Sequence, residues 1–172
     1  HAQAFFENTY QVEMESLYAP FLRYLPEQAL ILDLGCGSGR DTLAFKKKGY
    51  QVEAIDYSAE LVKKARELTN IEVRQQSFYD LAENNKYDGI WACASLLHCE
   101  RDRLTEVLGL IFKALKLNGH CSMHTDANIP FIQAGKYKHD ETRTLTNGNT
   151  LRIVDKYDPI TKRINGFWIL KD

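Results

Sequence analysis

The sequence has few of the features that mark secreted, membrane-spanning or nucleic-acid-binding proteins. Its 172 residues include only four cysteines, and these lack CxxC spacing, which favours reduced thiols over disulfides or zinc ligands. No charge sign dominates, because 22 Lys and Arg side chains accompany 23 Asp and Glu side chains, whereas a nucleic-acid-binding surface normally requires a basic excess. The longest nearly continuous apolar run, residues 89–97, is too short to cross a bilayer. We therefore expect a cytoplasmic protein that binds neither nucleic acid nor membrane.

Proline is also scarce, with four residues, while 44% of the chain is hydrophobic, so a sizeable core can form. The length is that of one domain, residues 1–172. Strand-like and helix-like patterns alternate with short connections, which is typical of a parallel sheet covered by helices. We expect an α/β fold, doubly wound, with a mostly parallel sheet and helices on both faces.

The expected elements fall into three regions. Residues 1–28 carry apolar residues at helical spacing, with Pro20 as a break, and would form helices that cover the sheet as a lid. Residues 29–125 would form the core. Its expected strands are 29–34, 50–55, 71–75, 87–93 and 120–125, and its expected helices are 40–48, one that begins after Ser58, and 102–117. Residues 126–172 contain two β-rich runs, 150–157 and 163–170, which predict a C-terminal antiparallel hairpin.

A glycine-rich turn between the first strand and the first core helix is the strongest functional signal. It reads LDLGCGSG at residues 32–39. Glycines there let the backbone approach a ligand closely, and the helix N-terminus offers free N–H groups to an anionic group. Asp56 lies 17 residues beyond Gly39 at the end of the second strand, where a carboxylate can accept both hydroxyls of a ribose. These residues predict a nucleoside-containing cofactor.

The glycine spacing separates the candidate cofactors. The dinucleotide fingerprint GxGxxG places its third glycine where this chain has Arg40, which counts against NAD. The pattern of residues 31–39, Asp56, the Ser77-Phe78 pair and YDGIWACASLLH at residues 87–98 resembles the class I S-adenosylmethionine-dependent methyltransferases. The resemblance covers roughly residues 10–125, and the last stretch is similar to small bacterial-type members, including the tellurite-resistance-like group. It implies a Rossmann-like fold, S-adenosylmethionine as cofactor and S-adenosylhomocysteine as product.

The resemblance also implies which residues bind the cofactor. These are Tyr10, Asp33, Gly35, Cys36, Gly37, Gly39, Asp56, Tyr57, Ser77, Phe78, Ala92 and Cys93. The glycines would line the methionine moiety, whose ammonium Asp33 would orient. Asp56 would hold the ribose and Tyr57 would pack beside the adenine.

Five other residues of that set, Tyr10, Ser77, Phe78, Ala92 and Cys93, would act in other ways. Many family members have an acidic residue where this chain has Ser77, so the polar contact to adenine would come from the Ser77 hydroxyl or the Phe78 backbone. The pair at 92–93 would offer backbone groups to the methionine end. Tyr10 would act as a lid residue.

The reaction asks little of side-chain chemistry, because a sulfonium methyl is already activated for in-line displacement onto a positioned small-molecule acceptor. If the acceptor is a hydroxyl or a cationic amine, a base must remove its proton. His98 is the catalytic candidate because it follows the fourth strand, although it could instead cap or pack its loop. A cofactor-binding protein without catalysis and, more remotely, an NAD-dependent oxidoreductase stay as alternatives. No metal site is expected, because His120 and His124 lie about 13 Å apart on an extended strand.

The C-terminal segment leaves two alternatives open. The hairpin could supply the last two strands of the seven-stranded family core directly. It could instead be an inserted hairpin on the substrate side, to which the resemblance leans, and the chain would then stop before the core is complete. In that case the exposed sheet edge would favour a partner such as a second copy, giving a homodimer.

Overall fold

The computed structural model describes residues 14–126, 140–144, 150–158 and 163–171. Its α-helices are α2 (Glu15–Leu22), α3 (Arg40–Lys47), α4 (Ala59–Thr69) and α5 (Leu104–Ala114), and short 3₁₀ helices are η1 (Phe78–Asp80), η2 (Leu96–His98) and η3 (Arg101–Arg103). The strands are β1 (Leu30–Leu34), β2 (Gln51–Asp56), β3 (Val73–Gln75), β4 (Tyr87–Cys93), β5 (Leu115–Asp126), β6 (Asp140–Thr144), β7 (Thr150–Asp158) and β8 (Arg163–Lys171). Tyr10 lies outside the described residues.

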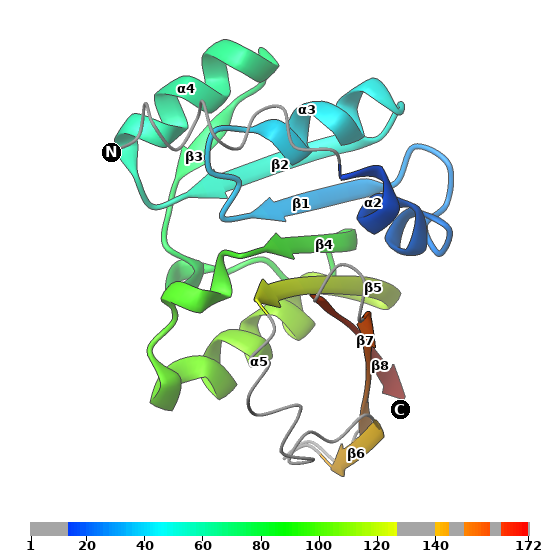
Figure 1. The fold of residues 1–172 in the computed structure, drawn as a ribbon. Coiled ribbons are helices and arrows are strands. Elements are labelled where there is room, and N and C mark those ends of the chain that lie inside the picture. Colours follow the sequence, from blue (N-terminus) through cyan, green and yellow to red (C-terminus); the bar gives the residue numbers. More distant parts are fainter. Residues whose placement is uncertain (1–13, 127–139, 145–149, 159–162, 172) are drawn as a thin grey trace.

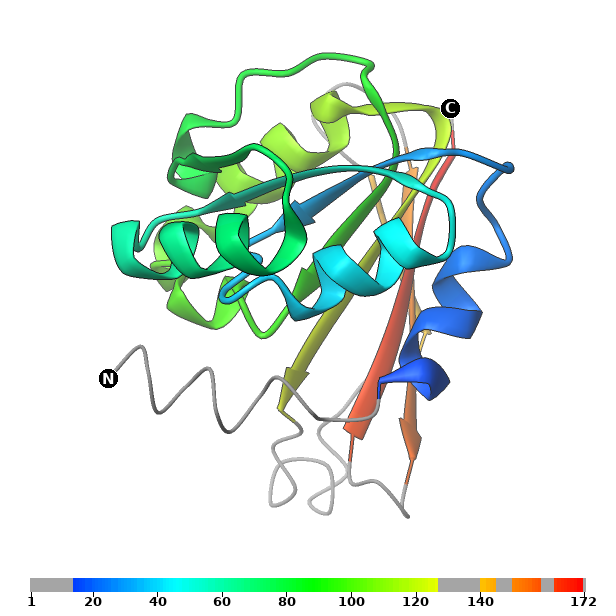
Figure 2. The same cartoon turned by 90° about the horizontal axis from the view of Figure 1, so that it is seen from above.

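All eight strands join one sheet in the order β3-β2-β1-β4-β5-β8-β7-β6 (Figure 1). Neighbouring strands are parallel from β3 to β5. Helices α2, α3 and α4 cover one face of this parallel part and α5 covers the other, as the second view shows (Figure 2). The prediction of a doubly wound, mostly parallel sheet with helices on both faces is confirmed.

Local signals explain where the early elements begin and end. Helix α3 starts after Gly39 and stops before Gly49, and both glycines have left-handed φ angles, 88° and 89°. Helix α4 begins after Ser58, whose hydroxyl accepts the Leu61 N–H as predicted for an N-cap. The glycine loop therefore sits between β1 and α3 as the sequence indicates.

Several elements differ from the expectation. Pro20 lies inside the last turn of α2 and does not break it, because the helix ends two residues later and little of it depends on the missing N–H. Helix α5 ends at Ala114, whereas the predicted helix ran to residue 117. Leu115 already pairs with Tyr87, and the strand register shifts before Gly89 pairs with His120. Asn118, with φ 65°, lies within that irregularity and does not cap a helix. Strand β6 was not predicted.

The C-terminal strands lie in the sheet. Strand β8 pairs antiparallel with β5, β7 pairs antiparallel with β8, and β6 with β7. Strand β8 thus lies directly beside β5. Whether these strands complete the family core or form an inserted hairpin on the substrate side stays a prediction. Dimerisation through a sheet edge stays a prediction.

The two faces of the sheet have different cores. On the α5 face, aliphatic residues of β1 and β4 pack against Val107 and Ile111. On the α2–α3 face the core is aromatic, since Tyr18, Phe21 and Phe45 surround Trp91 with ring centroids 5.0–5.9 Å apart. Helix α2 is thus anchored to β4 by its aromatic side chains.

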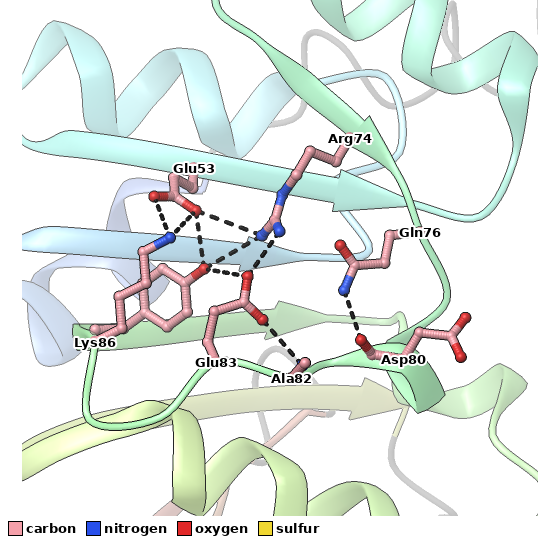
Figure 3. Close-up of polar contacts among 8 residues, drawn as sticks. Glu53, Arg74, Gln76, Asp80, Ala82, Glu83 and Lys86 are labelled. Carbon is pink, nitrogen blue, oxygen red and sulfur yellow. Dashed lines mark hydrogen bonds and ion pairs between the residues drawn. The ribbon is translucent and has the colours of Figure 1, made fainter.

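A charged network lies toward the amino end of β4, away from the glycine loop. Glu53 pairs with Lys86 at 2.7 Å and Arg74 pairs with Glu83 at 2.7 Å, as Figure 3 shows. The buried Tyr87 hydroxyl donates to Glu53 at 2.9 Å. These contacts fix the segment between β3 and β4 on the sheet.

Among the described residues, no helix combines the length and the apolarity that crossing a membrane requires.

Candidate cofactor site

The glycine loop is held against the carboxyl end of β2. The N–H groups of Gly35 and Cys36 both donate to the Ile55 carbonyl at 2.9 Å, and the Gly37 N–H donates to the Asp56 carboxylate at 2.8 Å. The Gly39 N–H closes the turn on the Cys36 carbonyl at 3.0 Å. The loop predicted from sequence is therefore a fixed backbone structure at the edge where parallel strands end.

The loop requires glycine at two positions for steric reasons. A Cβ atom on Gly35, whose φ is 77°, would lie 2.3 Å from Ser95 Cβ. A Cβ atom on Gly39, whose φ is 88°, would lie 2.9 Å from Thr69 Cγ2 and 3.1 Å from Ala65 Cα. Gly37 also has a positive φ, 56°. The glycines therefore serve packing as well as any ligand.

Asp56 binds backbone groups with both of its carboxylate oxygens. Oδ2 accepts the Gly37 N–H and Oδ1 accepts the Ser58 N–H, each at 2.8 Å. A carboxylate has about four acceptor positions, so these two bonds leave capacity for a ligand diol. Asp56 and the glycine loop are brought together as predicted.

Two features at the end of β4 destabilise the ligand-free protein. Ala94 has a left-handed φ of 56°, a conformation that costs about 1–2 kcal/mol for a residue with a Cβ. Ser95 follows Ala94 directly and packs against Gly35. It is 7% exposed, and its hydroxyl has no hydrogen-bond partner. Strain and an orphaned polar atom together are typical of functional sites. They fit a ligand held against the glycine loop and the end of β4.

Asp33 lies beneath the loop and is 2% exposed. It accepts a hydrogen bond from the Thr42 hydroxyl at 2.5 Å. Burial, and after it the negative charge of Asp41, raise the pKa of Asp33 to about 8. A raised pKa favours the neutral acid over the carboxylate, and the role of Asp33 toward the ammonium group stays a prediction.

A polar cluster that was not predicted from the sequence lies at the start of α3. Asp41, 5% exposed, accepts hydrogen bonds from the Tyr18 hydroxyl at 2.6 Å and from Trp91 Nε1 at 2.8 Å. Arg40 donates to the same carboxylate through Nε at 2.6 Å and Nη2 at 3.0 Å, and Nη2 lies 3.9 Å from Cys93 Sγ. The only sequence signal was an acidic residue in the first helical turn, which dipole complementarity alone explains.

Four other predicted residues turn their side chains to different uses. The Cys36 side chain packs under α4, and the Phe78 side chain packs on the α5-side core with Ala92. The Ser77 hydroxyl accepts the Tyr79 N–H at 3.2 Å and so caps η1. The Ser77 hydroxyl keeps its own O–H as a donor, because it only accepts in this cap.

The remaining predicted residues are Tyr57, His98 and Cys93. Tyr57 is 79% exposed beside Asp56, and His98 is exposed at the end of η2, three residues after Ser95. Burial raises the pKa of the Cys93 thiol to about 11. The histidines of β5 serve separate contacts, since His120 stacks on Tyr24 and His124 contacts Ser122 and Trp91. Within the part of the chain that the structure describes, no three His, Cys, Asp or Glu side chains gather as a metal site would need.

Comparisons with known proteins point to one family. A family described as "Methyltransferase domain" matches residues 31–119, just over half of the chain. An uncharacterized methyltransferase of Staphylococcus carnosus is 26% identical over 117 residues, which are 68% of this chain and 55% of that protein. The chain thus spans about half the length of the curated relatives it matches.

Solved structures share the fold. The PH0226 protein of Pyrococcus horikoshii aligns with a TM-score of 0.68 at 18% identity, over 90% of this chain and 87% of that one. A SAM-dependent methyltransferase of Archaeoglobus fulgidus aligns with a TM-score of 0.61 at 20% identity, over 79% and 66%. Together with the glycine loop, Asp56 and the parallel sheet, these matches show that the chain belongs to the methyltransferase-domain family, within the class I S-adenosylmethionine-dependent methyltransferases.

Proposed function

We propose that this protein transfers a methyl group from S-adenosylmethionine to a small-molecule acceptor. The observation that carries the proposal is the glycine loop, whose backbone is fixed against Asp56 at the carboxyl edge of the parallel sheet. Ligands of open α/β sheets bind at that edge. The orphaned Ser95 hydroxyl and the strained Ala94 at the end of β4 support a ligand at the same place.

Each end of the cofactor would have its own partners. Asp56 would accept the ribose hydroxyls with the acceptor capacity that Gly37 and Ser58 leave. The exposed Tyr57 ring would cover the adenine, and the backbone of Ser77 and Phe78 would meet its polar edge. The methionine moiety would pass over the glycines and the backbone at residues 92–93.

The charged methionine end would lie near the start of α3. Arg40 is the first residue of that helix, where N–H groups and the helix dipole also favour an anionic group. Although burial lowers it, the hydrogen bonds and charge of Asp41 raise the pKa of the Arg40 guanidinium above its ordinary value, so it stays charged. We assign the cofactor carboxylate to this guanidinium.

S-adenosylmethionine supplies an activated methyl group, so the protein has to position the acceptor in line and exclude water. Cys93 is not a competing nucleophile, because a thiol with a pKa of about 11 stays protonated near neutral pH. The exposed His98, at the end of η2, would take the acceptor proton. If it does, His98→Gln should lower kcat by about 10²-fold or more and leave the Kd of S-adenosylhomocysteine unchanged.

The test is transfer of a labelled methyl group from S-adenosylmethionine to a panel of hydroxyl, amine and thiol metabolites. The proposal predicts transfer by the wild type to one class of acceptor and its loss in Asp56→Ala. Tight binding of S-adenosylhomocysteine without any transfer would favour a cofactor-binding protein without catalysis. Binding of NADH in place of S-adenosylhomocysteine would favour the oxidoreductase alternative.

A further inference from the structure

The Asp41 carboxylate connects three elements that are distant in sequence. It accepts hydrogen bonds from Tyr18 on α2, from Trp91 on β4 and from Arg40, its neighbour on α3. Tyr18 lies 23 residues before Asp41 and Trp91 lies 50 residues after it. A side chain of helix α2 thus reaches the residue beside the glycine loop.

Burial makes every donor of this cluster important. Asp41 is 5% exposed and Trp91 is fully buried, so water cannot replace a donor that is lost. Burial, the charge of Asp41 and its hydrogen bond all raise the pKa of Tyr18 well above its ordinary range, which keeps the hydroxyl protonated as a donor. The carboxylate is therefore held in one orientation.

That orientation sets the plane of the Arg40 guanidinium. Nε faces Oδ1 and Nη2 faces Oδ2, a two-point contact. Such bidentate pairs fix a guanidinium in both direction and plane. Because Arg40 directly follows Gly39, rotating the Asp41 carboxylate would move the guanidinium relative to the glycine loop.

We propose that Tyr18 and Trp91 are positioning residues for the amino-acid end of the cofactor, acting through Asp41 on Arg40. The inference rests on the proposed function, since it assumes that S-adenosylmethionine and its product bind at the glycine loop. It gives helix α2 a role in cofactor affinity, in addition to its packing against β4.

Tyr18→Phe tests the relay with the smallest change, because it removes one hydroxyl and keeps the ring. Tyr87→Phe is the matched control, since the Tyr87 hydroxyl is also buried and also donates to a carboxylate, that of Glu53. Glu53 belongs to the charged network toward the other end of β4, where Figure 3 shows it beside Lys86 and Arg74. Calorimetric titration would compare S-adenosylhomocysteine with methylthioadenosine, which keeps the adenosine and lacks the amino-acid end.

We expect Tyr18→Phe to weaken S-adenosylhomocysteine binding by about three- to tenfold, or about 0.7–1.4 kcal/mol, and to leave methylthioadenosine binding unchanged within twofold. Tyr87→Phe should change neither affinity, although both variants lose a buried hydrogen bond. Arg40→Lys should show the same selectivity for the ligand with a carboxylate, because it keeps the charge and loses the fork.

Two results would overturn the relay while the proposed function stands. One is an equal loss for both ligands in Tyr18→Phe, and the other is an unchanged affinity for both. A wild type that binds neither S-adenosylmethionine nor S-adenosylhomocysteine would instead refute the proposed function, and the relay with it.

Discussion

Replacing Gly35 with alanine should destabilise the protein through two separable effects. The φ of 77° places the new residue in the left-handed region, at a cost of about 1–2 kcal/mol. The new Cβ would also lie 2.3 Å from Ser95 Cβ, so the loop or the end of β4 must move. Forcing a methyl group into a packed site costs about 1–3 kcal/mol. The free energy of unfolding should therefore fall by about 2–5 kcal/mol in total.

Gly49→Ala is the matched control for that variant. Gly49 has a similar φ, 89°, but an added Cβ would have no neighbour within 4 Å. Its substitution should cost only the conformational part, about 1–2 kcal/mol. Urea unfolding of both variants measures the difference, and titration with S-adenosylhomocysteine should show weaker binding for Gly35→Ala alone. Equal stability of the two variants would refute the assigned contact between Gly35 and Ser95.

Two further variants test buried polar groups of the site. For Asp33, a folded pKa of about 8 above the unfolded value of 3.8 means that its contribution to stability is complete at low pH and is lost as the pH rises toward and through 8. Asp33→Asn should therefore reduce the fall in the free energy of unfolding between pH 5 and 9. A fall as steep as that of the wild type would contradict this prediction. Ser95→Ala removes a buried hydroxyl without a partner, so the ligand-free protein should unfold at the same or a higher urea concentration. A loss above about 1 kcal/mol would show that the hydroxyl makes a hydrogen bond.

The elements that could be predicted from the sequence are those that depend on patterns within short segments. The strands around the glycine loop, the Ser58 cap and the position of Asp56 follow from hydrophobic periodicity and turn chemistry, which act over a few residues. The boundary between α5 and β5 could not be predicted in this way. Leu115 continues the apolar stripe of the helix, and only its pairing with Tyr87 makes it a strand residue.

The site shows the same division. The glycine loop is a local motif, whereas the role of Asp41 depends on two donors, Tyr18 and Trp91, that only the tertiary fold brings together. The orphaned hydroxyl of Ser95 has no sequence signal either, since a serine ahead of a short helix normally reads as a cap. Family resemblance located the region, and the contacts within it required the structure.

Calorimetric titration with S-adenosylmethionine and S-adenosylhomocysteine shows directly whether the glycine loop and Asp56 bind this cofactor, with NADH as the competing cofactor class. Asp56→Ala removes the carboxylate at the glycine loop. Asp88→Ala is its control, because Asp88 also accepts a backbone N–H, that of Leu30 at 2.9 Å, at the opposite end of the strands. The expected result is that the wild type and Asp88→Ala bind both ligands, that Asp56→Ala loses this binding, and that none of the three binds NADH. A folded wild type that binds NADH, or that binds neither sulfonium nor thioether ligand, would contradict it.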